Sequence, residues 1–172
     1  MGQGAETADK NIYRLSREKC GMSRQKAEDE SGISRQRIER IECHNYPASP
    51  KEVLDLSRTY KDPALCNLHC AQQCEIGREY VPLITMKDLS RIVLELLSSI
   101  NDAQQQRDRL ISIAADEKIT SNELQEFVNI QMQLEQISVT VETLQLWVQS
   151  MLMSGHIDQT EYKKLIKSYK QK

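Results

Sequence analysis

The chain has 172 residues, a formal net charge of −2 and five cysteines. This length allows one large domain or two small ones. The slightly negative charge excludes a protein that holds nucleic acid through bulk positive charge, so any DNA affinity must come from a local cluster of cations. With only six glycines, four prolines and 5% aromatic residues, the composition favours an all-α protein.

Residues 1–10 are polar and include Glu6 and Asp9. We expect them to form a flexible N-terminus rather than a secretory signal. No apolar run reaches the ~20 residues that a membrane-spanning helix needs. These features predict a cytoplasmic chain that has no membrane partner.

Residues 11–76 are expected to form a domain of about five short helices. Ser23 and Ser34 are each placed to cap a helix, because a serine hydroxyl accepts a hydrogen bond from a free first-turn amide. Gly32 lies between these two helices, where the chain must turn sharply. Ile38 and Ile41 supply the inward stripe of the second helix.

The outward face of that second helix begins with long polar side chains. Arg35, Gln36, Arg37 and Arg40 are left for solvent or for DNA. Arg can donate two parallel hydrogen bonds to guanine, and Gln can pair in the same way with adenine. Such a helix start is typical of one that enters the DNA major groove.

This pattern resembles the helix-turn-helix domain of the lambdoid phage repressors and the wider xenobiotic-response-element family, over residues 11 to about 68. The resemblance implies a repressor-like fold and binding of double-stranded operator DNA, usually as a homodimer. It assigns base reading to Arg35, Gln36 and Arg40, and phosphate contacts to Ser23, Arg24 and Arg37. It also implies an ion pair between Arg17 and Glu42, and it places Glu28 where a small residue is usual.

Three of the five cysteines are spaced four residues apart, at Cys66, Cys70 and Cys74, with His69 among them. On one helix this spacing stacks three sulfurs on a single face. These four residues are candidate metal ligands, because thiolates and one imidazole can complete a zinc shell. The alternative is a set of reduced thiols that pack as small hydrophobes. Since the chain has no second ligand pair, we expect no metal and no cofactor.

The C-terminal half is expected to be a dimerisation domain, over 87–172, which follows a linker at 77–86. A long helix at about 87–115 should end at Asp116-Glu117-Lys118. A second should run from Thr120 or Ser121 to about Ser154, and Asp158 should cap a short third helix. We therefore predict an antiparallel helical hairpin with a short third helix.

Apolar residues recur at steps of three and four in both long helices, as in a coiled coil. In the first helix the stripe contains Leu89, Val93, Leu96, Ile100 and Ala103. In the second it contains Phe127, Ile130, Leu134, Ile137, Val141, Leu144, Val148 and Met151. Leu146, Trp147 and Leu152 widen this second stripe beyond what one partner helix can cover, which favours a homodimer.

No catalytic constellation is visible. His44, His69 and His156 are scattered, and the chain has neither a phosphate-binding glycine loop nor a nucleophile motif. We expect a sequence-specific transcriptional regulator rather than an enzyme. The alternative is a protein-interaction adaptor or anti-repressor that retains a degenerate helix-turn-helix.

Overall fold

The computed structural model describes residues 11–43, 46–115 and 119–170. The described part contains ten helices and no strand, so the predicted all-α class is confirmed. The flexible N-terminus expected at 1–10, the loop residue His44 and the helix break expected at 116–118 lie outside the described residues. The helices are α1 (Ile12–Lys19), α2 (Arg24–Ser31), α3 (Arg35–Glu42), α4 (Pro50–Thr59), α5 (Ala64–Gln73), α6 (Glu75–Tyr80), α7 (Leu89–Gln105), α8 (Arg107–Ala114), α9 (Leu124–Met153) and α10 (Gln159–Lys170).

Each of the first four helices begins at a polar side chain that accepts a hydrogen bond from the first turn. Asn11, Ser23, Ser34 and Ser49 cap α1, α2, α3 and α4 in that order. Ser49 forms a full capping box, because Glu52 in turn accepts from the Ser49 amide. These local hydrogen bonds explain why the sequence predicted the helix starts so closely.

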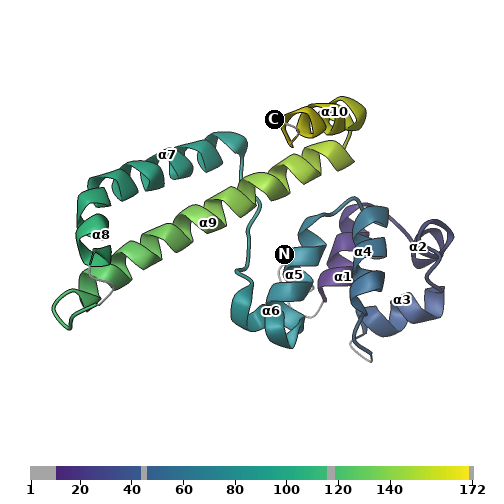
Figure 1. The fold of residues 1–172 in the computed structure, drawn as a ribbon. Helices are drawn as coiled ribbons and strands as arrows, with labels where there is room; N and C mark the ends of the chain where they lie inside the picture. Colours follow the sequence, from purple (N-terminus) through teal and green to yellow (C-terminus); the bar gives the residue numbers. More distant parts are fainter. Residues whose placement is uncertain (1–10, 44–45, 116–118, 171–172) are drawn as a thin grey trace, which may run out of the picture. The chain divides into compact units, whose positions relative to one another are not determined.

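α2, the turn at Gly32 and α3 form the helix-turn-helix (Figure 1). Gly32 ends α2 in the left-handed conformation with φ of 72°, which favours glycine because other residues meet their own Cβ there. The small residue that α2 buries is Ala27, which is fully buried. Glu28 is only half-buried, so its size does not obstruct the core.

The core of this domain is a single apolar cluster, to which α1 to α5 all contribute side chains. Its buried members are Tyr13, Ala27, Ile38, Ile41, Ala48, Val53, Leu56, Tyr60 and Leu65. Two of them, Ile38 and Ile41, fix the buried side of α3, as expected. The opposite side of α3 is thereby turned to solvent.

The structure corrects the prediction at the cysteines. α5 ends at Gln73, and Cys74 has extended backbone with ψ of 127°, so the third sulfur does not continue the helical face of Cys66 and Cys70. A further short helix, α6, occupies residues expected to begin the linker. Gly77 of α6 lies directly against the Cys70 carbonyl, which leaves no room for a Cβ there.

The chain divides into two compact units. The first contains α1 to α6 and the chain from Val148 onward, and the second runs from Ile84 to Trp147. The second unit contains the predicted hairpin, in which α7 and α9 pack side by side (Figure 1). The first arm is not one continuous helix, because it is interrupted at Gln106 between α7 and α8.

The predicted seams are only partly correct. In α7 the fully buried residue is Ile92, whereas Leu89, Val93 and Ile100 of the predicted stripe are exposed. In α9 the buried residues are Ile130, Thr140, Thr143 and Leu146. Leu134 and Val141 of the predicted seam are exposed, and Leu146 is not a surplus surface residue. The even spread of apolar residues around α9 explains the error, since the sequence alone does not say which face is covered.

The capping predicted for the C-terminal half is partly found. Glu123 accepts hydrogen bonds from the Thr120 amide and hydroxyl. Asp158 caps α10 by accepting from the Glu161 amide at 2.7 Å, and Gly155, with φ of 77°, follows the end of α9. In the part of the chain that the structure describes, no helix is both long enough and apolar enough to cross a membrane.

Candidate nucleic-acid interface

The candidate interface is the exposed face of α3, here called the α3 face and made of Arg35, Gln36, Glu39 and Arg40. At about 100° per residue these four side chains fall within roughly 140° of the helix circumference. The buried Ile38 and Ile41 lie on the other side. Helix periodicity therefore presents the predicted base-reading residues together and away from the core.

Two of the predicted base-reading side chains have no partner within the described part of the protein. Among the described residues, Arg35 and Gln36 make no side-chain hydrogen bond or ion pair. Arg40 lies over the ring of Tyr46, with its guanidinium carbon 5.8 Å from the ring centroid. A cation over an aromatic face gains a modest attraction, which orients Arg40 without neutralising its charge.

A buried ion-pair cluster fixes the angle of α3. Arg17 of α1 donates to both carboxylate oxygens of Glu42, at 2.6 and 3.1 Å. This is the pair expected from the sequence, and the Glu42 side chain is fully buried. The hydrogen bond with Glu42 raises the pKa of Arg17, so the guanidinium stays charged.

Arg24 of α2 joins the same cluster. It donates to Glu42 at 2.8 Å and to Glu39 at 2.9 Å. The sequence assigned Arg24 to phosphate, and its role in joining α1, α2 and α3 was missed. The charge on Arg24 is largely neutralised, although its Nη2 has no protein partner within the described ranges. Glu39 was also missed, and it lies in the middle of the α3 face.

Arg37 is likewise held by the protein. It donates to both oxygens of Glu52 in α4, at 2.6 and 2.8 Å, and to the Pro47 carbonyl. The hydrogen bond from Arg37, with those from Ser49, lowers the pKa of Glu52 to about 2. Arg37 thus joins α3 to the start of α4. The capping-box spacing of Ser49 and Glu52 was the signal in the sequence that could have revealed this carboxylate.

Ser23 is exposed and accepts the amide hydrogen of Lys26 at 3.1 Å. It lies at the N-terminus of α2, where free backbone amides favour an anion such as phosphate. The acidic run Glu28, Asp29 and Glu30 follows on the same helix. Gln25 donates to the first two of these carboxylates, which leaves their charge in place.

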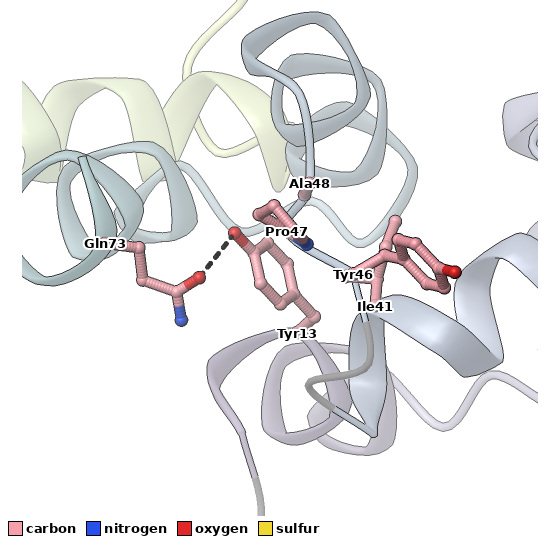
Figure 2. Close-up of a pocket in the computed structure, with 6 residues that line it drawn as sticks. All are labelled: Tyr13, Ile41, Tyr46, Pro47, Ala48 and Gln73. Atoms are coloured by element: carbon pink, nitrogen blue, oxygen red, sulfur yellow. Dashed lines mark hydrogen bonds between the residues drawn. The ribbon is translucent and has the colours of Figure 1, made fainter. Parts of the chain in front are cut away.

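Behind the C-terminal end of α3 lies a cavity of about 210 Å³. Figure 2 shows Tyr13 and Gln73 pointing toward one another at its wall, joined by a hydrogen bond of 3.5 Å. The Tyr13 hydroxyl also shares a hydrogen bond of 2.7 Å with His69 Nδ1. Asn11 closes this region by donating to the Ile41 carbonyl at 2.5 Å. The cavity is therefore backed by groups that position α3 from inside.

His69 has a structural role in this arrangement. Burial lowers the pKa of its imidazole, which favours the neutral form that pairs with Tyr13. Burial, followed by the neighbouring Cys74 and Cys66, raises the pKa of the Cys70 thiol. Cys66 and Cys70 line an apolar hollow with Val53 and Leu54. Across the described ranges, no group of three or more His, Cys, Asp or Glu residues could hold a metal ion.

Comparisons with known proteins give no match: no family model, no curated protein and no solved structure resembles this chain significantly.

Proposed function

We propose that the protein is a sequence-specific DNA-binding transcriptional regulator that inserts the α3 face into the major groove of operator DNA. The observation that carries this proposal is the pair Arg35 and Gln36. Both are exposed on the first turn of α3, and neither has a protein partner in the described part of the chain. A helix held rigidly from behind, with free donors in front, suits base readout.

The chemistry of each side chain suggests what it reads. Arg35 and Arg40 match guanine, whose O6 and N7 accept two parallel hydrogen bonds, and Gln36 matches adenine. Glu39 can accept from the amino group of cytosine. Its bond with Arg24 at 2.9 Å holds this carboxylate beside the base readers and reduces its repulsion of phosphate.

Phosphate contacts in this proposal come chiefly from the N-terminus of α2 and from Ser23. Arg24 and Arg37 contribute through the one terminal nitrogen of each that the described residues leave without a partner, Nη2 and Nη1 respectively. Because their charges are already paired with glutamates, we expect few counterions to be released and a shallow salt dependence. Two copies binding two half-sites would restore affinity, so the regulator is proposed to act as a homodimer.

A second candidate is an adaptor or anti-repressor that binds protein through the same domain. The acidic run at Glu28, Asp29 and Glu30, together with the paired state of Arg24 and Arg37, supports it. Such a surface would suit a basic protein segment. In that case Arg35 and Gln36 would contact a protein surface instead of bases.

Selection of bound sequences from a pool of randomised duplexes by the full chain separates the two candidates. The regulator predicts an enriched motif with two related half-sites about 10 base pairs apart or at a multiple of that spacing. Its affinity for the selected duplex should exceed that for random duplex by at least about 10³-fold. Equal, weak binding to every sequence would reject the regulator and favour the adaptor.

A further inference from the structure

The second unit carries a coherent apolar surface beside its own buried face. In α7 the buried side is marked by Ile92, which is fully buried, and by the half-buried Leu96, Ser99 and Ala103. These four residues fall within an arc of about 60° of the helix circumference. They define the side of α7 that is covered within the chain.

A second stripe of α7 is apolar but exposed. It consists of Leu89, Val93, Leu97 and Ile100, which are 38%, 41%, 59% and 40% exposed. At about 100° per residue the stripe spans roughly 80° and is centred about 90° from the buried side. α7 therefore has two apolar sides, and only one of them is covered.

α9 repeats this arrangement. Its covered side carries the buried Ile130 and Thr140 and the half-buried Ile137 and Leu144. Nearer the C-terminal end of α9, Thr143 and Leu146 extend the buried surface around the helix in the direction away from the second stripe. Its second stripe consists of Phe127, Leu134 and Val141, spaced seven residues apart; Phe127 is half-buried, Leu134 is 48% exposed and Val141 38%. This stripe is centred roughly 80° from the covered side. The predicted coiled-coil seam is thus divided between two neighbouring sides of one helix.

The two exposed stripes lie on the same side of the hairpin. Viewed from the N-terminus of either helix, a clockwise turn of about 80–90° leads from the covered side to the exposed stripe. Because α7 and α9 are antiparallel arms of a hairpin, these equal turns point the two stripes in one direction. We call this surface, made of Leu89, Val93, Leu97, Ile100, Phe127, Leu134 and Val141, the hairpin flank.

The hairpin flank is uncharged. Within its two arcs the only other residues of the second unit are the neutral Gln104 in α7 and Gln145 in α9. The residues just beyond the outer edges of the arcs are polar and neutral as well: Ser90 and Asn101 in α7, and Ser138 and Gln131 in α9. By contrast, α9 as a whole carries Glu126, Glu135 and Glu142 and no Lys or Arg. Glu135 and Glu142 lie outside the hairpin flank, on the side of Met132. Two copies can therefore meet through the flank without bringing like charges together.

The hairpin also has a small core of its own. Its buried apolar residues are Ile84, Ile92, Ile113, Ile130 and Leu146. Only Ile92, Ile130 and Leu146 of this core belong to α7 and α9, so the two helices need further apolar cover. A second copy of the chain is the one partner that is present wherever the chain itself is. In a four-helix bundle each helix contacts two neighbours on adjacent sides, as the two stripes of α7 and of α9 require.

We propose that the hairpin flank is the contact surface for a second copy of this chain, and that two hairpins dock face to face into a four-helix bundle. The hairpin flank would be the dimer contact of the proposed regulator, and only the role of the dimer in DNA binding rests on the proposed function. Its test contains no DNA, so it can succeed where the proposed DNA binding fails, and the reverse also holds.

The test measures the mass of the full-length chain by light scattering and by sedimentation over a range of concentrations. The wild type should have twice the chain mass at micromolar concentration, and its Tm should rise with concentration. Leu97→Glu and Leu134→Glu should each raise the dimer dissociation constant by at least about tenfold, because the two-fold axis brings two new carboxylates into an apolar contact.

Met132→Glu is the matched control. Met132 is 58% exposed on the same helix, about 160° around the circumference from Leu134, and its dissociation constant should equal that of the wild type. A monomeric wild type, or Leu97→Glu and Leu134→Glu dimers as tight as Met132→Glu, would overturn the proposal. If a flank variant loses helicity, the concentration dependence of the wild-type Tm decides: its presence supports the dimer, and its absence refutes it.

Discussion

Individual charged residues decide how α3 is held. Glu42 has no exposed side-chain surface and receives hydrogen bonds from two arginines on two other helices. Removing one member of a buried cluster leaves the others charged without a partner, which costs more than the cluster contributes in total. The orientation of the α3 face therefore depends on one carboxylate that is itself fully buried.

Glu42→Gln should destabilise the N-terminal domain by about 3–5 kcal/mol, because Arg17 loses its buried counter-ion and Arg24 keeps only the exposed Glu39. Urea denaturation followed by circular dichroism measures this change. Glu39→Gln is the control, since Glu39 also pairs with Arg24 but its side chain is 53% exposed; it should cost under about 1 kcal/mol. Equal losses from the two variants would contradict the buried cluster.

Glu52 gives a pH-dependent signature. Its folded-state pKa of about 2 is below the ordinary value of 4.5, so the pair with Arg37 stabilises the fold above about pH 4.5. This stabilisation is lost progressively as the pH falls from 4.5 toward 2. Urea midpoints across this range should fall less steeply for Glu52→Gln than for the wild type. Parallel curves for the two proteins would mean that the pair does not contribute.

At the scale of helices, the sequence predicts what local chemistry specifies. The serine caps at Ser23, Ser34 and Ser49 and the turn at Gly32 are local, so the ends of α2, α3 and α4 were predictable. The pair between Arg17 and Glu42 could be expected only from the family resemblance, since the two residues are 25 positions apart. The positions of α3 residues followed from the 3.6-residue period alone.

Other features depend on tertiary contacts and could not be predicted from the sequence. α6 forms where Gly77 meets the Cys70 carbonyl, a contact that has no local signature. The pairing of Arg37 with Glu52 removes a cation that the sequence assigned to phosphate. In α9 the apolar residues surround the helix, so the repeat indicated a packed helix but not which of its sides the chain itself covers.

Substitution of the glycines separates the local effects from the tertiary ones. Gly32→Ala should cost about 1–2 kcal/mol from its left-handed φ alone, since nothing stands within 4 Å of the added Cβ. Gly77→Ala should instead force α6 away from the Cys70 carbonyl. Hydrogen exchange of Glu75–Tyr80 amides should then lose protection in Gly77→Ala but not in Gly32→Ala. Unchanged protection in Gly77→Ala would contradict the close approach of α5 and α6.

At the scale of the molecule, each of the two units presents a different surface. The first presents an α3 face with free donors, and the second presents an uncharged apolar flank. Because Arg24 and Arg37 are paired with glutamates, one domain offers little electrostatic affinity for DNA. Specific binding would then depend on bringing two α3 faces to one duplex, for which the hairpin flank is suited.

The proposed function requires that Arg35 reads a base. The most direct test is the affinity of full-length wild type and Arg35→Ala for the selected duplex and for duplexes changed at each position in turn. Arg35→Ala should lose about 1–3 kcal/mol on the selected duplex and lose discrimination at one base pair per half-site. Arg58→Ala, at a 71% exposed arginine of α4, should bind as the wild type does. If Arg35→Ala keeps both the affinity and the preference, the α3 face does not read DNA.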